Sequence, residues 1–173
     1  MSATTRRLAL RQTRPHLTPM DVSALSAPVR AALAGRDAIV FDGVCVLCSG
    51  FFRLVARHDR AGRFAFVTAQ SDLGRAMYRD LGLPADDFET NLVIVDGRIH
   101  QRLDAFAAAM GALGRPWSAL ALLRHLPAAL KDPAYHLIAR NRYRIFGRTD
   151  TCLVPTPTLR ARFLDSRPAS EAA

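Results

Sequence analysis

The chain has 173 residues, of which 50% are hydrophobic and 23% are charged, with ten glycines and ten prolines. These values predict one globular domain with a substantial core, and they exclude collagen-like, wholly disordered and disulfide-stapled proteins. We expect no membrane span, because charged residues and prolines interrupt the most apolar stretch, residues 105–130, and a bilayer requires about 20 apolar residues in a row. The three cysteines are too few, and odd in number, for a secreted disulfide framework.

The net charge of +9 lies mostly near the two ends of the chain. Residues 1–36 contain six arginines and one acidic residue, residues 37–139 have no net charge, and residues 140–162 contain six arginines and one aspartate. A nucleic-acid-binding protein more often carries basic and aromatic residues interleaved on its folded body. Nucleic acid is therefore not the expected partner, and binding to nucleic acid or to a membrane surface through the two basic segments is a competing interpretation.

Residues 1–36 lack a strand pattern and predict a disordered N-terminal extension, with at most a short helix over Val22–Leu33. Their basic, nearly acid-free composition resembles a transit peptide, so import into an organelle is an alternative. Arg6-Arg7 does not form a twin-arginine signal, because Arg11 interrupts the apolar residues that follow. Without a signal peptide or a membrane span, the expected location is the cytoplasm.

Strand and helix patterns alternate from residue 37 onward. The predicted elements are strands at 38–41, 64–68, 91–95 and 99–102 and helices at 44–59, 71–81, 104–113, 117–126 and 133–146. Asp96-Gly97 favours a tight hairpin between the third and fourth strands. Asp132, Pro133 and Gly147 are typical of a helix that begins at Pro133 and ends just before the glycine.

This order of elements predicts an α/β protein with a thioredoxin-like fold. The first strand-helix-strand unit is expected to place its two strands parallel, and the hairpin adds an antiparallel strand. We therefore expect a four-stranded mixed sheet flanked by helices, with extra C-terminal helices, over residues 37–164. Residues 165–173 are expected to form a tail.

Cys45 and Cys48 form a CxxC motif at the point where a predicted buried strand turns into a helix. Thiols in the first helical turn face unpaired backbone N–H groups and the positive end of the helix dipole, both of which stabilise a thiolate. The motif predicts thiol–disulfide exchange. Cys45, nearer to the strand end and to solvent, is expected to attack a disulfide, and Cys48, deeper in the turn, to resolve the mixed disulfide.

Two other interpretations of these cysteines are open. Together with Cys152 and a histidine they would form a Cys₃His zinc site, although the histidines show no paired ligand spacing. Alternatively, both are inert buried residues in a non-enzymatic binding module of the same fold. Redox chemistry is the preferred hypothesis, and it requires neither a bound cofactor nor a metal.

Asp42 precedes Cys45 by three residues, at the carboxyl end of the predicted strand. Its carboxylate is a candidate general base for Cys48, able to accept or return the proton that the thiols exchange. Its charge would also oppose a nearby thiolate and raise a thiol pKa. The structural alternative, compatible with the catalytic one, is that the Asp42 side chain caps the following helix.

The segment Phe41–Cys48 resembles the signature of the DCC family of thiol-disulfide oxidoreductases, which is named for the Asp, Cys and Cys that Asp42, Cys45 and Cys48 match. The resemblance continues at 63–66, 82–84, 138–147 and 150–152, and it spans residues 37–164. It implies a thioredoxin-like fold and a redox activity, with a disulfide-containing substrate and an electron donor as partners. The matching segments add four supporting site residues, which are Arg140, Asn141, Arg142 and Cys152.

Two features differ from ordinary thioredoxins. Val46-Leu47 separates the cysteines where thioredoxins have Gly-Pro, so their redox potential cannot be transferred to this chain. Thr90 occupies the place of the thioredoxin cis-proline that shapes the substrate groove, and it is therefore a further supporting residue. Cys152 is either a small buried residue or a third thiol near the CxxC motif that forms an alternative disulfide.

Arg140 and Arg142 lie two positions apart in the last predicted helix and so point about 200° away from each other. Arg142 interrupts an apolar stripe, so we expect it to be more buried than Arg140. A buried guanidinium requires an acidic side chain or backbone carbonyls as partners, and Asp42 is the most interesting candidate. The alternative is that Arg142 lays only its methylene groups along the stripe and extends its charge to water.

Overall fold

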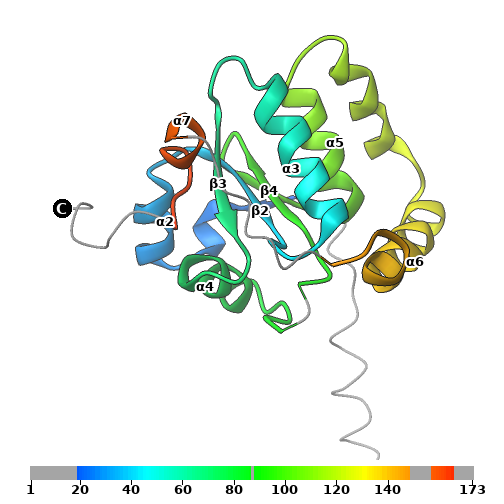
Figure 1. The fold of residues 1–173 in the computed structure, drawn as a ribbon, viewed down its shortest axis with the longest axis horizontal. Helices are drawn as coiled ribbons and strands as arrows, with labels where there is room; N and C mark the ends of the chain where they lie inside the picture. The colour runs from blue at the N-terminus through cyan, green and yellow to red at the C-terminus, as the bar shows by residue number, and fades with distance from the viewer. Residues whose placement is uncertain (1–18, 87, 149–156, 166–173) are drawn as a thin grey trace, which may run out of the picture.

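The computed structural model of the chain describes residues 19–86, 88–148 and 157–165. Its elements in chain order are β1 (Met20–Asp21), the 3-10 helix η2 (Val22–Ala24), α2 (Ala27–Leu33), β2 (Asp37–Phe41), α3 (Val46–His58), β3 (Phe64–Thr68), α4 (Asp72–Asp80), β4 (Leu92–Val95), β5 (Arg98–Gln101), α5 (Arg102–Ala112), the 3-10 helix η3 (Trp117–His125), α6 (Ala128–Phe146) and α7 (Pro157–Arg160). The five strands within these residues form one mixed sheet in the order β1-β5-β4-β2-β3, with helices on both faces (Figure 1). The protein thus has the predicted thioredoxin-like α/β fold.

The parallel strand pair and the hairpin form as the sequence predicts. β2 runs parallel to β3, with Ile39 opposite Phe66, and antiparallel to β4. β4 and β5 form the hairpin, in which Asp96 and Gly97 have φ angles of +50° and +73°. Positive φ at both positions is what a two-residue hairpin turn requires. β2 and β3 are buried along almost their whole length, as expected for strands covered on both faces.

Residues 19–36 belong to the fold, which corrects both the predicted boundary at residue 37 and the predicted number of strands. β1 pairs antiparallel with β5, with Met20 opposite Ile99, and adds a fifth strand at the edge of the sheet. A strand of two residues carries no sequence pattern, so only its tertiary contact defines it. Residues 1–18, which hold the rest of the predicted extension, lie outside the described part of the chain.

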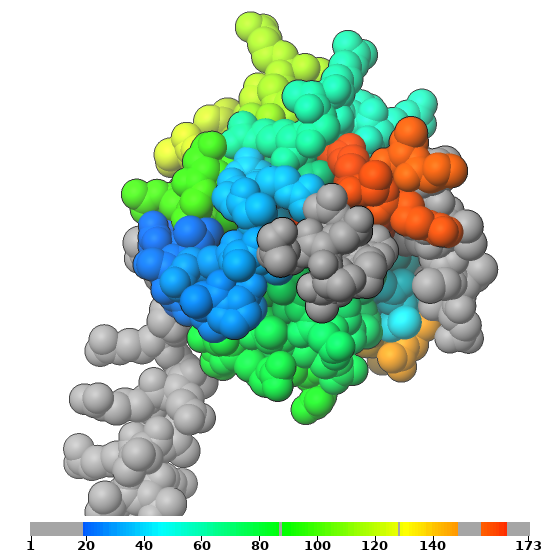
Figure 2. Space-filling view, turned by 90° about the vertical axis from the view of Figure 1, so that its left-hand side faces the viewer, coloured from blue at the N-terminus to red at the C-terminus, as the bar shows by residue number. Residues whose placement is uncertain are grey.

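The short helix α2 anchors this N-terminal segment to the body of the protein. Leu25, Val29 and Leu33 are buried in the core on the side of the sheet that α4 also covers. The Ser26 N–H donates a hydrogen bond to the Asp80 carboxylate at 2.8 Å and so joins the start of α2 to the end of α4. Figure 2 shows the N-terminal segment, in blue, lying against the green segment that includes α4.

A phenylalanine-rich core lies on the other side of the sheet. Figure 1 shows α3 and α5 covering this face. The Phe41 and Phe52 rings stack with their centroids 4.6 Å apart, and Phe163 from the end of the described chain packs edge-on against both. This packing fixes α3 on the sheet and thereby sets the position of the turn that precedes it. The CxxC motif therefore lies at the carboxyl end of β2.

Residues 162–164 run along the outer edge of β3. The Phe66 N–H donates to the Arg162 carbonyl and the Leu164 N–H to the Phe66 carbonyl, both at 2.9 Å. These bonds cover part of an edge that would otherwise present unpaired backbone groups.

Helix α6 begins at Ala128, five residues before the predicted start at Pro133, and the proline lies inside the helix. The sequence predicted a start at Pro133 because a proline inside a helix has no N–H to donate to the helical hydrogen-bond pattern. In the structure, ion pairs to α5 hold the first turns of α6 in place. The Lys131 ammonium contacts both Asp104 carboxylate oxygens at 2.6 and 2.8 Å, and Asp132 lies 3.8 Å from Arg102.

Candidate active site

Cys45 is the N-cap residue of α3, and Cys48 lies in the first turn of the same helix. Cys45 has an extended backbone, with φ −87° and ψ 120°, and its Sγ accepts a hydrogen bond from the Cys48 backbone N–H at 3.4 Å. The sulfur thus takes the place of the oxygen that Ser, Thr or Asp supplies at most helix N-caps. A negative charge on Cys45 is stabilised by this N–H and by the helix dipole.

The exposure of the two thiols is the reverse of the sequence-based prediction. Cys45 is completely buried, at 0% exposed, whereas Cys48 is half-buried. The backbone that follows α6 passes beside Cys45: Arg148 forms an isolated antiparallel bridge with it, and the Val46 N–H lies 3.5 Å from the Gly147 carbonyl oxygen. Sequence spacing within the motif cannot reveal a contact with so distant a segment.

Hydrogen bonding makes Cys45 the more acidic of the two thiols. The pKa of Cys45 is lowered to about 6, chiefly because the Cys48 thiol donates a hydrogen bond to its sulfur, with further contributions from the Cys48 N–H and the positive charge of Arg142. Burial and the negative charge of Asp42 oppose this shift. The pKa of Cys48 is raised, because the Cys45 sulfur holds its S–H and because it is buried. The pair therefore shares one proton, carried by Cys48.

Asp42 is a buried hydrogen-bond acceptor at the end of β2. Its Oδ1 accepts from the Val44 N–H at 3.1 Å and from the Gln70 side-chain amide at 2.6 Å. Its Oδ2 accepts from the Tyr143 hydroxyl and from the Arg142 guanidinium, the latter at 3.4 Å. These four donors satisfy a carboxylate that is closed off from water. The carboxylate supports the turn before α3 and does not cap the helix, since the cap is the cysteine sulfur.

The predicted contrast between the two arginines of α6 is confirmed. Arg142 is 3% exposed and donates hydrogen bonds to Asp42, to the Ala139 carbonyl at 2.8 Å and to the Tyr143 hydroxyl at 2.9 Å. Arg140 is exposed and reaches only to within 3.8 Å of Glu89. The buried guanidinium thus links the last long helix to the turn before the CxxC motif, and the alternative in which it extends to water is wrong.

A cavity of about 330 Å³ lies beside Cys48. Its apolar walls come mainly from α3, α5 and α6 and consist of Phe41, Leu47, Phe51, Phe88, Leu103, Phe106, Ile138, Ala139 and Phe146. The polar residues at its surface are Asp42, Glu89, Asn91, Arg102, Tyr135 and Arg142. Cys48 forms part of the wall and Cys45 does not. A mostly apolar hollow with a few convergent polar groups is typical of a small-molecule site, for which volumes of about 300–1,000 Å³ are usual.

The other predicted supporting residues lie away from this cavity. Asn141 donates its side-chain amide to the Leu137 carbonyl of its own helix at 2.8 Å. Thr90 contributes its backbone carbonyl, which accepts a hydrogen bond from the Tyr78 hydroxyl, and its side chain does not line the cavity. Cys152 lies outside the described residues.

Sequence reasoning missed Gln70 and Tyr143, which both bind Asp42. A signal for Gln70 was present, because it follows β3, and the carboxyl ends of neighbouring parallel strands meet at one edge of a sheet. Tyr143 adjoins Arg142 in the helix, so its hydroxyl shares the same partner. Burial, and next the hydrogen bond to Asp42, raises the pKa of Tyr143 to about 12, so it donates its proton at neutral pH.

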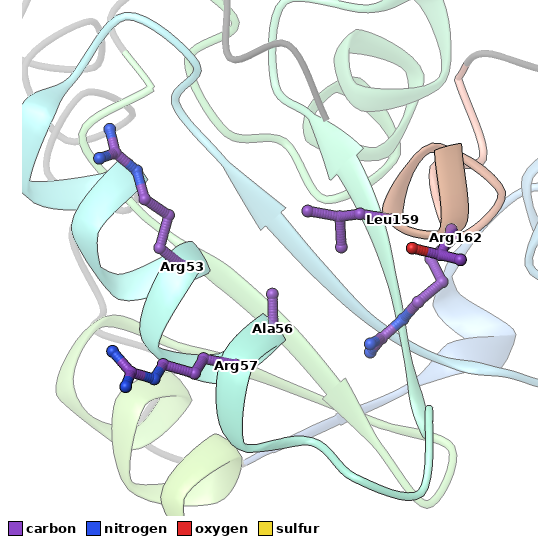
Figure 3. A pocket seen from close by; sticks show the side chains of 6 residues that line it. Arg53, Ala56, Arg57, Leu159 and Arg162 are labelled. Carbon is purple, nitrogen blue, oxygen red and sulfur yellow. The ribbon is translucent and has the colours of Figure 1, made fainter. Parts of the chain in front are cut away.

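A second hollow, of about 380 Å³, lies farther along α3 and is lined by Arg53, Ala56, Arg57, Thr158, Leu159 and Arg162. Figure 3 shows Arg53 and Arg57 extending from α3, with Leu159 and Arg162 on the other side of the hollow. The Arg162 guanidinium binds the Asp59 carboxylate and the Phe64 carbonyl. This basic hollow has no cysteine in its lining.

Within residues 19–86, 88–148 and 157–165, no three His, Cys, Asp or Glu side chains lie close enough together to hold a metal ion. The zinc alternative also requires Cys152, which is not among these residues. None of the helices in the described part of the chain combines the length and the apolar character needed to cross a bilayer.

Comparison with known proteins agrees with this geometry. The family model described as DCC1-like thiol-disulfide oxidoreductase matches residues 39–148, a range that includes Asp42, both cysteines and Arg142. The chain is 34% identical over 126 residues to the uncharacterized protein YuxK of Bacillus subtilis (strain 168), which covers 73% of this chain and 92% of YuxK. It is 33% identical over 118 residues to the DCC family protein At1g52590, chloroplastic, of Arabidopsis thaliana, which covers 68% of this chain and 69% of that protein. No solved structure is significantly similar to this chain.

Proposed function

Because the chain belongs to the DCC1-like thiol-disulfide oxidoreductase family, we propose that it is a dithiol–disulfide oxidoreductase whose redox pair is Cys45 and Cys48. The observation that carries this proposal is the Cys45 sulfur at the N-cap of α3, where the Cys48 N–H and thiol both donate hydrogen bonds to it. The redox-active group is the cysteine pair itself, without a separate cofactor or metal. A reducing compartment such as the cytoplasm would keep the pair in the dithiol form.

The proposed reaction passes two electrons between the pair and a disulfide-containing substrate. In the reducing direction, one thiolate of the pair attacks a substrate R–S–S–R, forms a mixed disulfide and releases RS⁻. The other sulfur attacks the mixed disulfide, closes the Cys45–Cys48 disulfide and releases the second RS⁻. The substrate gains two electrons and the pair loses them. A separate dithiol donor then returns the electrons to the pair.

Asp42 is proposed to move the protons that this exchange requires. Its carboxylate lines the cavity beside Cys48, and its charge acts on the pKa values of both thiols. Four hydrogen-bond donors hold the carboxylate in one orientation beside this cavity. The positive charge of Arg142 offsets the repulsion between this carboxylate and a thiolate.

Turnover of a simple disulfide by single-cysteine variants tests this function. With dithiothreitol as the donor and hydroxyethyl disulfide as the substrate, the wild-type protein should turn over, whereas Cys45→Ser and Cys48→Ser should each lose turnover. Cys152→Ala is the matched control: if Cys152 is a small buried residue and not a third redox thiol, this variant should keep turnover while losing about 1 kcal/mol of stability. Thiol titration should show two thiols that appear on reduction and disappear on oxidation. Stoichiometric zinc in the purified protein, or turnover in both single variants, would contradict the proposal.

A further inference from the structure

Helix α6 exposes an apolar stripe on its outer side. Of the nine large apolar side chains that are exposed among the described residues, five belong to α6. Four of these share one face of the helix, and we call them the outer stripe: Leu130, Leu137, Ile138 and Ile145. Leu137 and Ile145 are 66% and 60% exposed. In Figure 1, α6 lies at the edge of the molecule, away from the sheet.

The spacing of these residues makes the outer stripe one continuous surface. Leu130 and Leu137 are seven residues apart, as are Ile138 and Ile145, and seven residues are close to two helical turns. An apolar stripe of this kind usually packs on the core of a protein. In α6 the side that packs on the core is a different one, which includes the buried Arg142. The outer stripe is therefore a second apolar face, which the described part of the chain leaves exposed.

Positive charge borders the outer stripe. Arg140 and Arg144 are exposed and lie four residues apart, so they are neighbours along one side of the stripe. The one acidic residue of α6, Asp132, is half-buried and lies 3.8 Å from Arg102. Glu89 approaches Arg140 to 3.8 Å and offsets part of its charge. The exposed face of α6 is thus apolar along its centre and positive along one margin.

We propose that this face of α6 docks on the anionic surface of a lipid bilayer, with the outer stripe among the lipid headgroups and Arg140 and Arg144 against their phosphates. Helices that lie in the plane of a bilayer combine an apolar face with basic residues, and anionic lipids attract exposed arginines. The helix lies along the surface and does not cross the bilayer, because it lacks the apolar character of a membrane-spanning helix. This inference goes beyond the proposed redox function and does not depend on it.

Charge favours a lipid surface over a second copy of this chain. Most homodimers have two-fold symmetry, so the same surface would face itself. Arg140 and Arg144 of one copy would then lie near those of the other, and the helix offers only the half-buried Asp132 to balance them. An anionic bilayer supplies both the opposite charge and an apolar layer for the stripe.

The composition of the outer stripe favours a bilayer over nucleic acid as well. Nucleic acids bind to basic residues through their phosphates and to aromatic side chains through their bases. The outer stripe consists of leucine and isoleucine, which offer no ring for a base to stack on. A nucleic acid would therefore contact the arginines and leave the apolar part of the face in water.

The outer stripe adjoins the apolar cavity beside Cys48. Ile138 is 45% exposed and also lines that cavity, so the stripe and the cavity share a side chain. Phe146, at the end of the same helix, is likewise both exposed and part of the cavity wall. Docking through α6 thus places the cavity next to the lipid surface.

Sedimentation with lipid vesicles tests the docking. The full chain should bind vesicles made of equal amounts of phosphatidylcholine and phosphatidylglycerol. The double variant Leu137→Ser, Ile145→Ser should bind them at least about tenfold more weakly, because it removes two apolar side chains from the contact. Leu122→Ser is the matched control, since it removes an exposed leucine of η3, and it should bind as the wild type does. No binding by the wild type, or equal binding by the double variant, would overturn the proposal.

Single arginine variants test the role of charge. Arg144→Gln should weaken binding to the mixed vesicles by about fivefold, and Arg140→Gln by less, because Glu89 already offsets part of its charge. Arg57→Gln removes an exposed arginine of α3 and is the control for net charge, so its effect should be much smaller. If Arg144→Gln bound as tightly as the wild type, the assignment of an anionic surface would be wrong.

Tryptophan fluorescence shows whether α6 enters the lipid, without depending on a loss of binding. The chain has one tryptophan, Trp117, in η3. Leu137→Trp adds a second one on the outer stripe. Phosphatidylcholine with brominated acyl chains, mixed with phosphatidylglycerol, should quench the fluorescence of this variant more strongly than that of the wild type. Equal quenching would show that the stripe stays outside the bilayer and would overturn the proposal.

Self-association is the outcome that would replace the bilayer with a second copy of the chain. Light scattering of the wild type without vesicles should show a monomer. A dimer that the double variant Leu137→Ser, Ile145→Ser dissociates would overturn the proposal. None of these measurements bears on the redox function, because turnover of a small disulfide is measured without lipid.

Discussion

Two buried aspartates, one at each end of α3, pair with arginines from far along the chain. Asp42 precedes the helix and pairs with Arg142, and Asp59 follows the helix and pairs with Arg162. In both pairs the carboxylate side chain is almost completely buried, at 0% and 4% exposed. Each pair therefore fastens a C-terminal segment to the first strand-helix unit of the fold.

The surroundings of the two pairs differ much more than the pairs themselves. Arg142 lines the apolar cavity together with Cys48, whereas Arg162 lines the basic hollow of Figure 3, which has no cysteine in its lining. The two hollows have similar volumes, about 330 and 380 Å³, so size does not identify the site. Both ion pairs hold an end of α3, but only the Asp42–Arg142 pair has a thiol beside it, in the lining of the same cavity.

The largest effect is expected from Asp42→Ala. The substitution leaves the Arg142 guanidinium buried without its carboxylate, which costs about 3–5 kcal/mol of the free energy of unfolding. It also removes the proposed proton carrier from beside Cys48, so thiol–disulfide exchange should slow in the protein that stays folded. Urea unfolding and the rate of reaction with a small disulfide measure the two effects. If the variant were as stable as the wild type and exchanged disulfides at the same rate, the Asp42–Arg142 pair would have no role in the thiol chemistry.

Asp59→Ala is the counterpart at the other end of α3, and it should destabilise the protein without changing the thiols. The carboxylate accepts hydrogen bonds from the Arg63 and Phe64 N–H groups at 3.0 and 2.9 Å and also from Arg162. Because the Arg162 side chain is 21% exposed and can reach water, we expect a smaller loss, of about 2–3 kcal/mol. Exchange rates measured well below the unfolding transition should equal those of the wild type, and slower exchange would contradict the comparison.

The stability of the reduced protein should depend on pH through Cys45. Its pKa is about 6 in the folded state, against an ordinary value of 9. Between these two values the unfolded thiol holds a proton that the folded one has lost, so the free energy of unfolding rises with pH, by up to about 1.4 kcal/mol per pH unit. This contribution is lost as the pH falls through 6. The oxidised protein has no such thiol and should lack the slope, which denaturation over a pH series at constant salt would show.

Tyr143→Phe should have a smaller effect at the same end of the helix. It removes one of the four donors to Asp42 and an acceptor for Arg142, while three donors to the carboxylate remain. The expected loss is about 1–1.5 kcal/mol, the usual contribution of a hydrogen bond to stability. A change in the pH profile of thiol reactivity would show that the hydroxyl also controls the carboxylate. An unchanged pH profile would mean that the Tyr143 hydroxyl contributes to stability only.

Local sequence patterns predicted the features that depend on neighbouring residues. The strand-helix order, the Asp96-Gly97 hairpin and the placement of the CxxC motif at a helix start are all set by residues close together in the sequence. The burial of Arg142 was predictable for the same reason, because helical periodicity alone places it on the inner face. A buried positive charge needs a partner, and the central body has only a few acidic residues that could pair with Arg142.

Features that depend on distant segments were not predictable. The strand β1 is defined only by its pairing with the edge of β5. Cys45 is buried next to the backbone segment that follows α6, which lies about 100 residues away in the sequence. The N-cap rule places both sulfurs correctly along α3 but contains no information about which one faces a cavity. The left-handed backbone of Arg102 has no sequence signal either, since such conformations are usually marked by glycine.

The smallest effect is expected from Arg140→Gln, which tests whether burial or overall helix charge matters in α6. The Arg140 side chain is 74% exposed and lies 3.8 Å from Glu89, and exposed ion pairs contribute from nothing to about 1 kcal/mol. We expect the free energy of unfolding to change by less than about 0.5 kcal/mol and thiol reactivity to stay unaltered.

Arg142→Gln is the comparison variant, because it removes the same charge from the same helix. It takes a buried hydrogen-bond donor away from Asp42, so it should lower the free energy of unfolding by about 3 kcal/mol and raise the pKa of Cys45. Urea unfolding and the pH dependence of alkylation compare the two variants directly. If both variants slowed alkylation equally, the thiolate would be stabilised by the positive charge of α6 as a whole. The buried Asp42–Arg142 pair would then have no specific effect on the thiols.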